Sequence, residues 1–448
     1  MRKRVYHNCV IVNEGAEKPG YLVAGGDYIL DVDTADGYGA RLSALLAEPG
    51  TEAVDCGGGL LMPGVIDTHV HFREPGLTDK ADIASESRAA IAGGVTSYFE
   101  MPNTSPATTT VELWADKMAR AAEASEANYA FFIGATADNL GELLRADYTR
   151  VPGIKLFLGS STGGMLVTGD DVLAPLFENA PAPIAIHAED EAIVSAARAR
   201  LSEEYPEGIP LGLHPEVRPR EACIAATRHA IALAERYGTA IHICHISTAE
   251  ELDIIAGAKA RGVRVTAETC PQYLMFDRTD LQTLGARVKC NPAVKEASDR
   301  IALIRALRPG GAIDTIATDH APHLPAHKEG NALTAASGMP MVQFSLAAML
   351  DLIGSDPEAE ESLTPARVAE LMCHAPARIF GVSRRGFLRR GFFADLVLAR
   401  PLGLPGRKVT DADVVSKCGW TPLDGRPLTW QVETLSHTAM PLTFEKHP

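Results

Sequence analysis

Apolar, strand-like runs alternate with amphipathic, helix-like runs along most of the chain. Eight strand-like runs occur, at residues 64–72, 95–103, 129–136, 153–161, 182–190, 239–247, 264–273 and 312–323. Helix-like patterns separate several of them, at residues 111–125, 220–237 and 249–262. Near-continuous apolar runs are typical of parallel strands buried on both faces. Eight strand–helix repeats predict an α/β fold built on a (β/α)₈ TIM barrel, which we expect at residues 63–375.

The two ends of the chain have a different pattern. Residues 1–62 and 376–448 contain short extended runs separated by glycine-rich turns. We expect these runs to be strands of one small β-sandwich-like domain that is built from both termini.

Composition excludes several classes of partner. The net charge of −15 argues against nucleic acid or an anionic membrane as the main partner, although a local basic pocket could still bind a small anion. None of the eight cysteines forms a C-x-x-C pair, which is typical of reduced thiols in a cytoplasmic protein. We expect no signal peptide and no membrane span, because no apolar stretch reaches the roughly 18 to 20 residues that a span requires.

Polar residues occur at the predicted carboxyl ends of five strands, which form the active-site face of a (β/α)₈ barrel. They are His69, His71, Lys155, His187, His245 and Asp319. Alternate strand residues point to the same side, so His69 and His71 can converge on one point. A lone H-x-H pair is more often structural, but the whole set indicates a metal site, because imidazole suits zinc and related divalent ions.

Lys155 and the pair His242 and His245 leave choices open. An ammonium cannot ligate a metal, so Lys155 either extends from the barrel rim or is carboxylated to a carbamate that bridges two metals. Charge counting favours the carbamate, because two divalent ions need more negative charge than Asp319 and a bridging hydroxide supply. His242 and His245 lie three residues apart and face opposite sides of a strand. We assign His245 as the ligand because it lies closer to the strand end.

Seven motifs together resemble the amidohydrolase superfamily and, within it, the dihydroorotases: DTHVHFREPG, EMPNT, IKLFLGSSTG, IHAED, HICHIS, KCNPAV and TDHAPH. The resemblance implies two divalent metal ions, which are usually zinc in this family, and a carbamate on Lys155. The implied metal ligands are His69, His71, Lys155, His187, His245 and Asp319. The implied contacts to the substrate are Arg73, Asn103, Asn291 and His323.

The resemblance also implies an activity. It is the reversible cyclisation of N-carbamoyl-L-aspartate to L-dihydroorotate in pyrimidine biosynthesis, with a metal-bridging hydroxide as nucleophile and Asp319 as proton carrier. A cytoplasmic homodimer is expected by the same resemblance. The alternatives are an allantoinase or hydantoinase and, in another class, a catalytically inactive scaffold. Ala293 and Gln343 depart from common dihydroorotase residues and weaken the substrate assignment. Residues 327–340 are a candidate lid.

Overall fold

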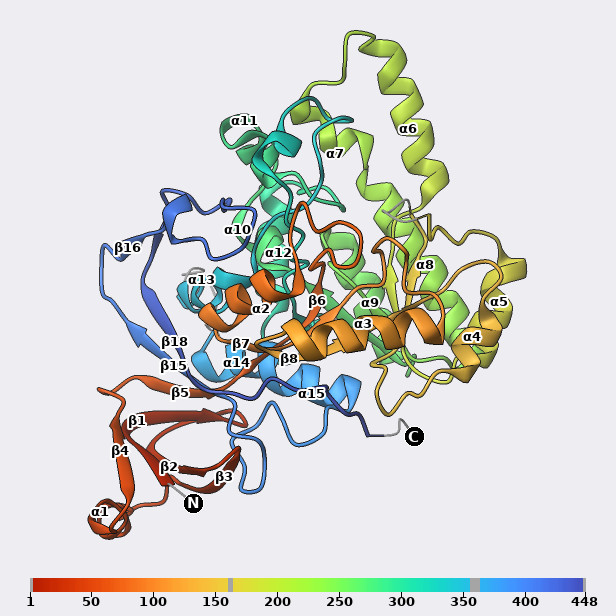
Figure 1. Ribbon diagram of the computed structural model, residues 1–448. Coiled ribbons are helices and arrows are strands. Elements are labelled where there is room, and N and C mark those ends of the chain that lie inside the picture. The colour runs from red at the N-terminus through yellow and green to blue at the C-terminus, as the bar shows by residue number, and fades with distance from the viewer. Residues whose placement is uncertain (1–2, 160–163, 355–362, 446–448) are drawn as a thin grey trace.

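The computed structural model describes residues 3–159, 164–354 and 363–445 and has a mixed α/β architecture with parallel sheets (Figure 1). The parallel strands are β6 (Val65–Val70), β7 (Val95–Glu100), β8 (Asn128–Phe131), β9 (Ile133–Gly134), β10 (Ile154–Phe157), β11 (Ile184–His187), β12 (Ile241–Ile243), β13 (Val265–Thr269) and β14 (Thr315–Ile316). Each of the eight predicted runs corresponds to one strand, except the run at 129–136, which corresponds to β8 and β9 with only Phe132 between them.

These strands pair in the order in which they occur along the chain. One parallel sheet is β6-β7-β8 and the other runs from β9 to β14. A parallel bridge between Val70 and His320 links the residues that follow β14 to β6, and the His71 N–H donates to the His320 carbonyl at 2.8 Å. The carboxyl ends of the first and last strands therefore lie side by side.

Helices connect the strands. The longer ones are α2 (Ile83–Ala92), α3 (Val111–Ala124), α5 (Asp170–Asn179), α6 (Glu191–Glu204), α8 (Arg220–Tyr237), α9 (Ala249–Ala260) and α12 (Ala297–Ala306). The shorter ones are α4 (Leu140–Arg145), α7 (His214–Val217), α10 (Pro271–Met275), α11 (Asp280–Thr283), α13 (Ser345–Asp351), α14 (Pro365–Ala369) and α15 (Ala375–Phe380). Single turns are η1 (Leu211–Leu213), η2 (Gly285–Val288), η3 (Pro325–Lys328), η4 (Val342–Phe344), η5 (Glu370–His374) and η6 (Asp411–Asp413).

The three helices predicted from the sequence start and stop close to the expected residues. Thr110 caps α3 by accepting a hydrogen bond from the Leu113 N–H, and Thr248 caps α9 in a reciprocal capping box with Glu251. The α8 helix ends at Gly238, whose left-handed conformation (φ 70°) suits glycine. Within the described ranges, every helix is too short or too polar to cross a lipid bilayer.

Strands from both ends of the chain form one sheet at the lower left of Figure 1. Its members are β1 (Lys3–Asn13), β2 (Ala16–Gly25), β3 (Tyr28–Asp33), β4 (Thr51–Asp55), β5 (Leu60–Pro63), β15 (Leu396–Pro401) and β18 (Trp430–Ser436). The order is β18-β15-β5-β1-β2-β3, with β4 also on β1. These strands of both termini form one continuous hydrogen-bonded sheet, and the sandwich-like domain stays a prediction. The α1 helix (Gly39–Ala47) was not predicted.

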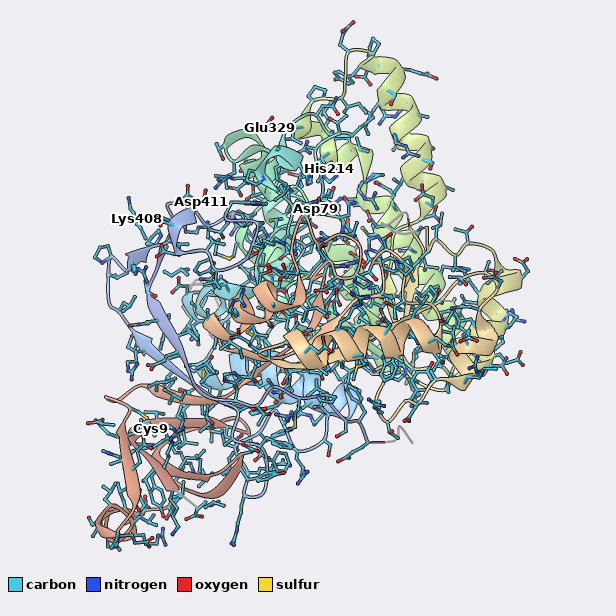
Figure 2. The ribbon with its side chains drawn as sticks, in the orientation of Figure 1. Cys9, Asp79, His214, Glu329, Lys408 and Asp411 are labelled. Carbon is cyan, nitrogen blue, oxygen red and sulfur yellow. The ribbon has the colours of Figure 1, made fainter. Side chains whose placement is uncertain are left out.

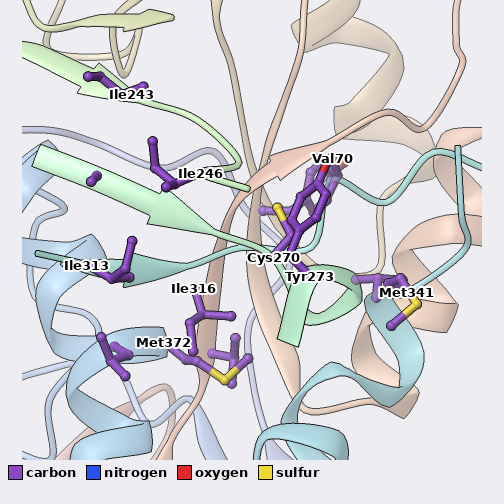
Figure 3. Packing of buried hydrophobic residues seen from close by; sticks show 14 of the residues in the cluster. Val70, Ile243, Ile246, Cys270, Tyr273, Ile313, Ile316, Met341 and Met372 are labelled. Carbon is purple, nitrogen blue, oxygen red and sulfur yellow. The ribbon is translucent and has the colours of Figure 1, made fainter. Parts of the chain in front are cut away.

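One apolar cluster joins the parallel strands to the helices around them. Figure 3 shows part of it, and its members there include Ile243 and Ile246 of the β12 region, Ile316 of β14 and Val70 of β6. Burying an aliphatic side chain of this size contributes about 1.5–3 kcal/mol. Val397 of β15 belongs to the same cluster, so part of the terminal sheet packs against the core of the parallel strands, while its other buried residues form separate clusters.

Part of the C-terminal region leaves the terminal sheet and crosses to the carboxyl ends of the parallel strands. This return segment, residues 407–421, includes β16 (Arg407–Lys408), which pairs with β17 (Pro427–Leu428). Arg287 and Asp411 form an ion pair at 2.5 Å, and the Lys417 N–H donates to Glu86 Oε1 at 3.0 Å. Lys408 and Asp411 are labelled in Figure 2.

Candidate metal centre

A cavity of about 90 Å³ opens at the carboxyl ends of the parallel strands. Its walls are His69, His71, Arg73, Asn103, Phe157, His187, His245, Asn291, Asp319, Ala321, His323, Ser337 and Gly338. The structure therefore brings together every residue that the sequence suggested for the site, except Lys155, which lies behind the wall.

The first half of the site consists of two histidines and an aspartate. His69 lies in β6, His71 follows directly after it, and Asp319 comes three residues after β14. Asp319 Oδ1 lies 3.4 Å from His69 Nε2 and 3.0 Å from His71 Nε2. The ligand atoms of these three side chains lie within 4.8 Å of one another, as they must to hold one ion.

The second half consists of His187 and His245. His187 is the last residue of β11, and His245 follows β12 by two residues. His187 Nδ1 lies 2.9 Å from His245 Nε2. His242, which we did not choose as a ligand, faces elsewhere: its ring nitrogens contact Thr266 Oγ1 and Glu268 Oε2.

Three of the histidines are anchored through the ring nitrogen that does not face the other ligands. The acceptors are Glu268 Oε1 for His69 Nδ1 (2.8 Å), Asn103 Oδ1 for His71 Nδ1 (2.8 Å) and Glu189 Oε2 for His187 Nε2 (2.9 Å). Such an acceptor fixes the tautomer and leaves the lone pair of the other nitrogen directed into the site, as in metal-binding histidines. The donor set therefore fits divalent metal ions.

Burial keeps these imidazoles neutral. It lowers the pKa of His69 and His187, and it lowers the pKa of His71 and His245 still further. Neutral imidazole is the form that binds a metal. Burial raises the pKa of the Asp319 carboxyl, which suits a group that has to hold a proton for part of a reaction.

Two buried carboxylates behind the histidines were not identified from the sequence. Glu268 on β13 contacts His69, Thr68 and His242. Burial raises the pKa of its carboxyl, but the interactions with His69 and His242 outweigh burial and hold that pKa well below the ordinary value. Glu189 contacts His187 and forms an ion pair with Arg218 at 2.5 Å. A glutamate inside an apolar strand run is the signal that could have identified Glu268.

Lys155 is completely buried in the middle of β10, deeper than the strand end where we expected it. Its Nζ donates to Cys244 Sγ at 3.1 Å and lies 5.1 Å from the centre of the Phe157 ring. Among the described residues, no carboxylate lies within ion-pair distance of Nζ. After burial, the Lys155 charge is one of the causes that lower the pKa values of all four site histidines.

The other end of the cavity carries the residues expected to contact a substrate. Arg73 Nε donates to the Pro322 carbonyl at 3.1 Å, and Arg73 Nη2 lies 3.1 Å from His323 Nε2. Burial lowers the pKa of Arg73 only to about 10, so the guanidinium is a buried cation at neutral pH. Asn291 Oδ1 is buried without a hydrogen-bond partner among the described residues. Asn103 lies at the cavity, but its Oδ1 already accepts from His71.

Three of the cavity residues have strained backbone conformations. Arg73 (φ 73°), His245 (φ 43°) and Asp319 (φ 46°) all lie in the left-handed region, which is uncommon for residues other than glycine. Such strain persists only where the surroundings hold it, and it concentrates at functional sites. The last four residues of the motif IKLFLGSSTG, 160–163, lie outside the described residues.

The family model for the amidohydrolase family matches residues 60–417, and the chain belongs to that family. The dihydroorotase of Pelobacter propionicus is 37% identical over 411 residues, which cover 90% of this chain and 92% of that protein. The allantoinase of Rubrobacter xylanophilus is 33% identical over 392 residues, covering 86% and 84%. The L-hydantoinase structure from Arthrobacter aurescens superposes with a TM-score of 0.89 at 25% identity, covering 99% of this chain and 100% of that one.

Proposed function

We propose that the protein is a metal-dependent cyclic amidohydrolase that interconverts L-dihydroorotate and N-carbamoyl-L-aspartate. The observation that carries this proposal is the composition of the cavity. One end has four neutral histidines and Asp319, and the other end has the buried cation Arg73. A ring amide that carries a carboxylate needs both ends. Relatives named dihydroorotase, at 33–37% identity, support the choice of substrate.

The donor set suits two divalent ions, for which zinc is our proposal. His69, His71 and Asp319 would hold one ion, and His187 and His245 would hold the other. We propose that Lys155 carries a carbamate shared by both ions, because this converts a buried cation without a carboxylate partner into an anion among the ligands. When bound, the ions would lower the pKa of water and polarise the ring carbonyl.

The protein side chains would perform the remaining steps. Asp319 would take the proton from the water that attacks the ring carbonyl and deliver it to the departing ring nitrogen. Arg73 would hold the carboxylate of the substrate through charge-assisted hydrogen bonds, together with Asn103, and His323 and Asn291 would contact the other side of the substrate. Fixing the carboxylate places the ring amide near Asp319, so binding is converted into rate.

The same cavity could serve an allantoinase or a hydantoinase. Relatives with 33–35% identity are named allantoinase, and the L-hydantoinase shares the fold. The proposed metal ligands do not discriminate between these substrates, because each substrate contains a ring amide. We favour dihydroorotate because the motifs EMPNT and KCNPAV bring Asn103 and Asn291 into the cavity wall beside Arg73, as a substrate with a carboxylate requires.

A comparison of substrates tests the proposal. Metal-loaded protein is assayed with L-dihydroorotate, allantoin and a 5-substituted hydantoin, and we expect the highest kcat/KM with L-dihydroorotate. Activity on allantoin or the hydantoin without activity on L-dihydroorotate would overturn the substrate assignment. Asp319→Asn is the matched chemical test: turnover near the wild-type rate with metals bound would remove Asp319 as proton carrier.

We also propose that the eight parallel strands form a (β/α)₈ barrel over residues 63–375. The pairings from β6 to β8 and from β9 to β14, together with the Val70–His320 bridge, support it. Residues 1–62 and 376–448 would form the second domain.

A further inference from the structure

The wall of the cavity around Arg73 is built from two backbone segments, residues 322–323 and 337–338. The Pro322 carbonyl accepts a hydrogen bond from Arg73 Nε, and His323 Nε2 lies 3.1 Å from Arg73 Nη2. Ser337 O lies 3.0 Å from His323 Nε2, and a Cβ at Gly338 would lie only 2.5 Å from Ala321 O. Because these atoms are in close contact, a shift of either segment would move the guanidinium.

The return segment holds the first of these backbone segments from behind. Trp420 is 1% exposed, and its Nε1–H donates to the His323 carbonyl at 2.7 Å. The segment is itself fixed to η2 through the Arg287–Asp411 ion pair and to α2 through the Lys417 contact with Glu86. Trp420 lies more than 300 residues away from Arg73 in the sequence, yet it holds the backbone of His323, whose ring lies beside the Arg73 guanidinium.

Lys328 holds the second backbone segment. Its Nζ donates to three carbonyls: Lys289 O (3.1 Å), Ala336 O (2.7 Å) and Gly338 O (2.8 Å). Lys289 precedes Asn291 by two residues, so one ammonium ties the Asn291 side of the cavity to the Gly338 side. Nζ also lies 5.6 Å from the centre of the Trp420 ring, which brings the two supports into contact.

We propose that Trp420 and Lys328 are positioning residues for the anion-binding end of the cavity, which hold His323 and Gly338 so that Arg73 meets the carboxylate of the substrate. The inference rests on the proposed function, because it assigns the carboxylate to Arg73. Neither side chain lines the cavity, so both act through the backbone. Residues 327–340, the candidate lid, are fixed by Lys328 and by the Ala336 N–H, which donates to the His327 carbonyl at 2.7 Å.

The signature of this role is a split between KM and kcat. Trp420→Phe keeps an aromatic ring and removes one N–H donor, so Arg73 loses precise placement while the metal ligands stay in position. The loss of one hydrogen bond corresponds to about a three- to tenfold effect. We expect the KM for L-dihydroorotate to rise by about this factor, with kcat and metal content close to the wild-type values.

The chain offers a matched control in Trp114. Its buried indole also donates to a backbone carbonyl, Phe131 O at 3.0 Å, but on α3 and outside the cavity wall. Trp114→Phe removes an equivalent hydrogen bond and should lower stability without raising KM. Lys328→Met should raise KM at least as much as Trp420→Phe, because three carbonyls lose their donor.

The outcomes separate the inference from the proposed function. A wild-type protein that turns over none of the three ring substrates overturns the proposed function and this inference with it. An active Trp420→Phe protein with unchanged KM overturns the inference alone, as does an equal rise of KM in Trp114→Phe. If Lys328→Met does not fold, the comparison of KM between Trp420→Phe and Trp114→Phe still tests the inference.

Discussion

Replacing Lys117 with methionine would leave a buried carboxylate without its counter-ion. Lys117 Nζ lies 2.7 Å from Glu100 Oε2 and also donates to the Met101 carbonyl, and both charged side chains are fully buried. Glu100 Oε1 in turn accepts the N–H of Phe72, between the two site residues His71 and Arg73. The pair therefore supports the segment that carries the metal and substrate contacts.

The size of the loss follows from the proton that the carboxylate can take up. Burial raises the pKa of Glu100 to about 6 even though Lys117 lowers it, against an ordinary value of 4.5. In the wild type above pH 6, the ionised Glu100 lowers the free energy of unfolding by about 2 kcal/mol relative to a carboxyl with the ordinary pKa. Without Lys117 the carboxyl would remain protonated at pH 7.5, at a cost of about 4 kcal/mol relative to the unfolded chain.

The sign of the pH dependence is therefore fixed. A raised carboxyl pKa means that the folded state binds the proton more tightly, so stability falls as pH rises from the unfolded pKa to the folded one. This window extends beyond pH 7.5 in Lys117→Met and ends near pH 6 in the wild type. We expect the variant to lose about 2 kcal/mol more, relative to the wild type, at pH 7.5 than at pH 5.5.

Urea unfolding at pH 5.5 and 7.5, followed by tryptophan fluorescence, measures this difference. The control is Arg120→Met on the same helix, which breaks an exposed pair with Asp116 and should cost well under ~1 kcal/mol at either pH. The double variant Glu100→Gln/Lys117→Met has no carboxyl to titrate and should lose the extra pH dependence. Equal losses of Lys117→Met at both pH values, or a double variant with the same pH dependence, would refute the reasoning.

Three further predictions concern the proposed metal centre and substrate. Glu268→Gln should weaken metal binding about 10- to 100-fold in a chelator titration, because His69 loses a charged acceptor, and unchanged affinity would contradict this role. Lys155→Ala should purify with fewer metal ions per chain than the wild type by elemental analysis, and full loading would contradict the shared carbamate. Arg73→Met should raise the KM for L-dihydroorotate by at least about tenfold with metal content unchanged, and an unaltered KM would remove Arg73 from carboxylate binding.

The sequence predicts those parts of the molecule that depend on local pattern. The positions of the parallel strands, and the residues at their ends, follow from apolar runs and from alternation along a strand. The supports behind the site do not follow from local pattern. Glu268 contacts His69, which lies 199 positions earlier in the sequence. Trp420 contacts His323, although the sequence around Trp420 has the same pattern as the terminal strands. Lys155 lies deeper than predicted because β10 continues two residues past it.

The order of the terminal sheet has a consequence for synthesis of the chain. β5, which leads directly into the strand of His69, pairs on one side with β1 and on the other with β15. β15 begins at Leu396, so at 5–20 residues per second it leaves the ribosome roughly 20 to 70 s after β5. During that interval β5 has an unpaired edge, which is a template for association with other chains. A nascent chain of this protein therefore needs protection at Leu60–Pro63 until its last strands are made.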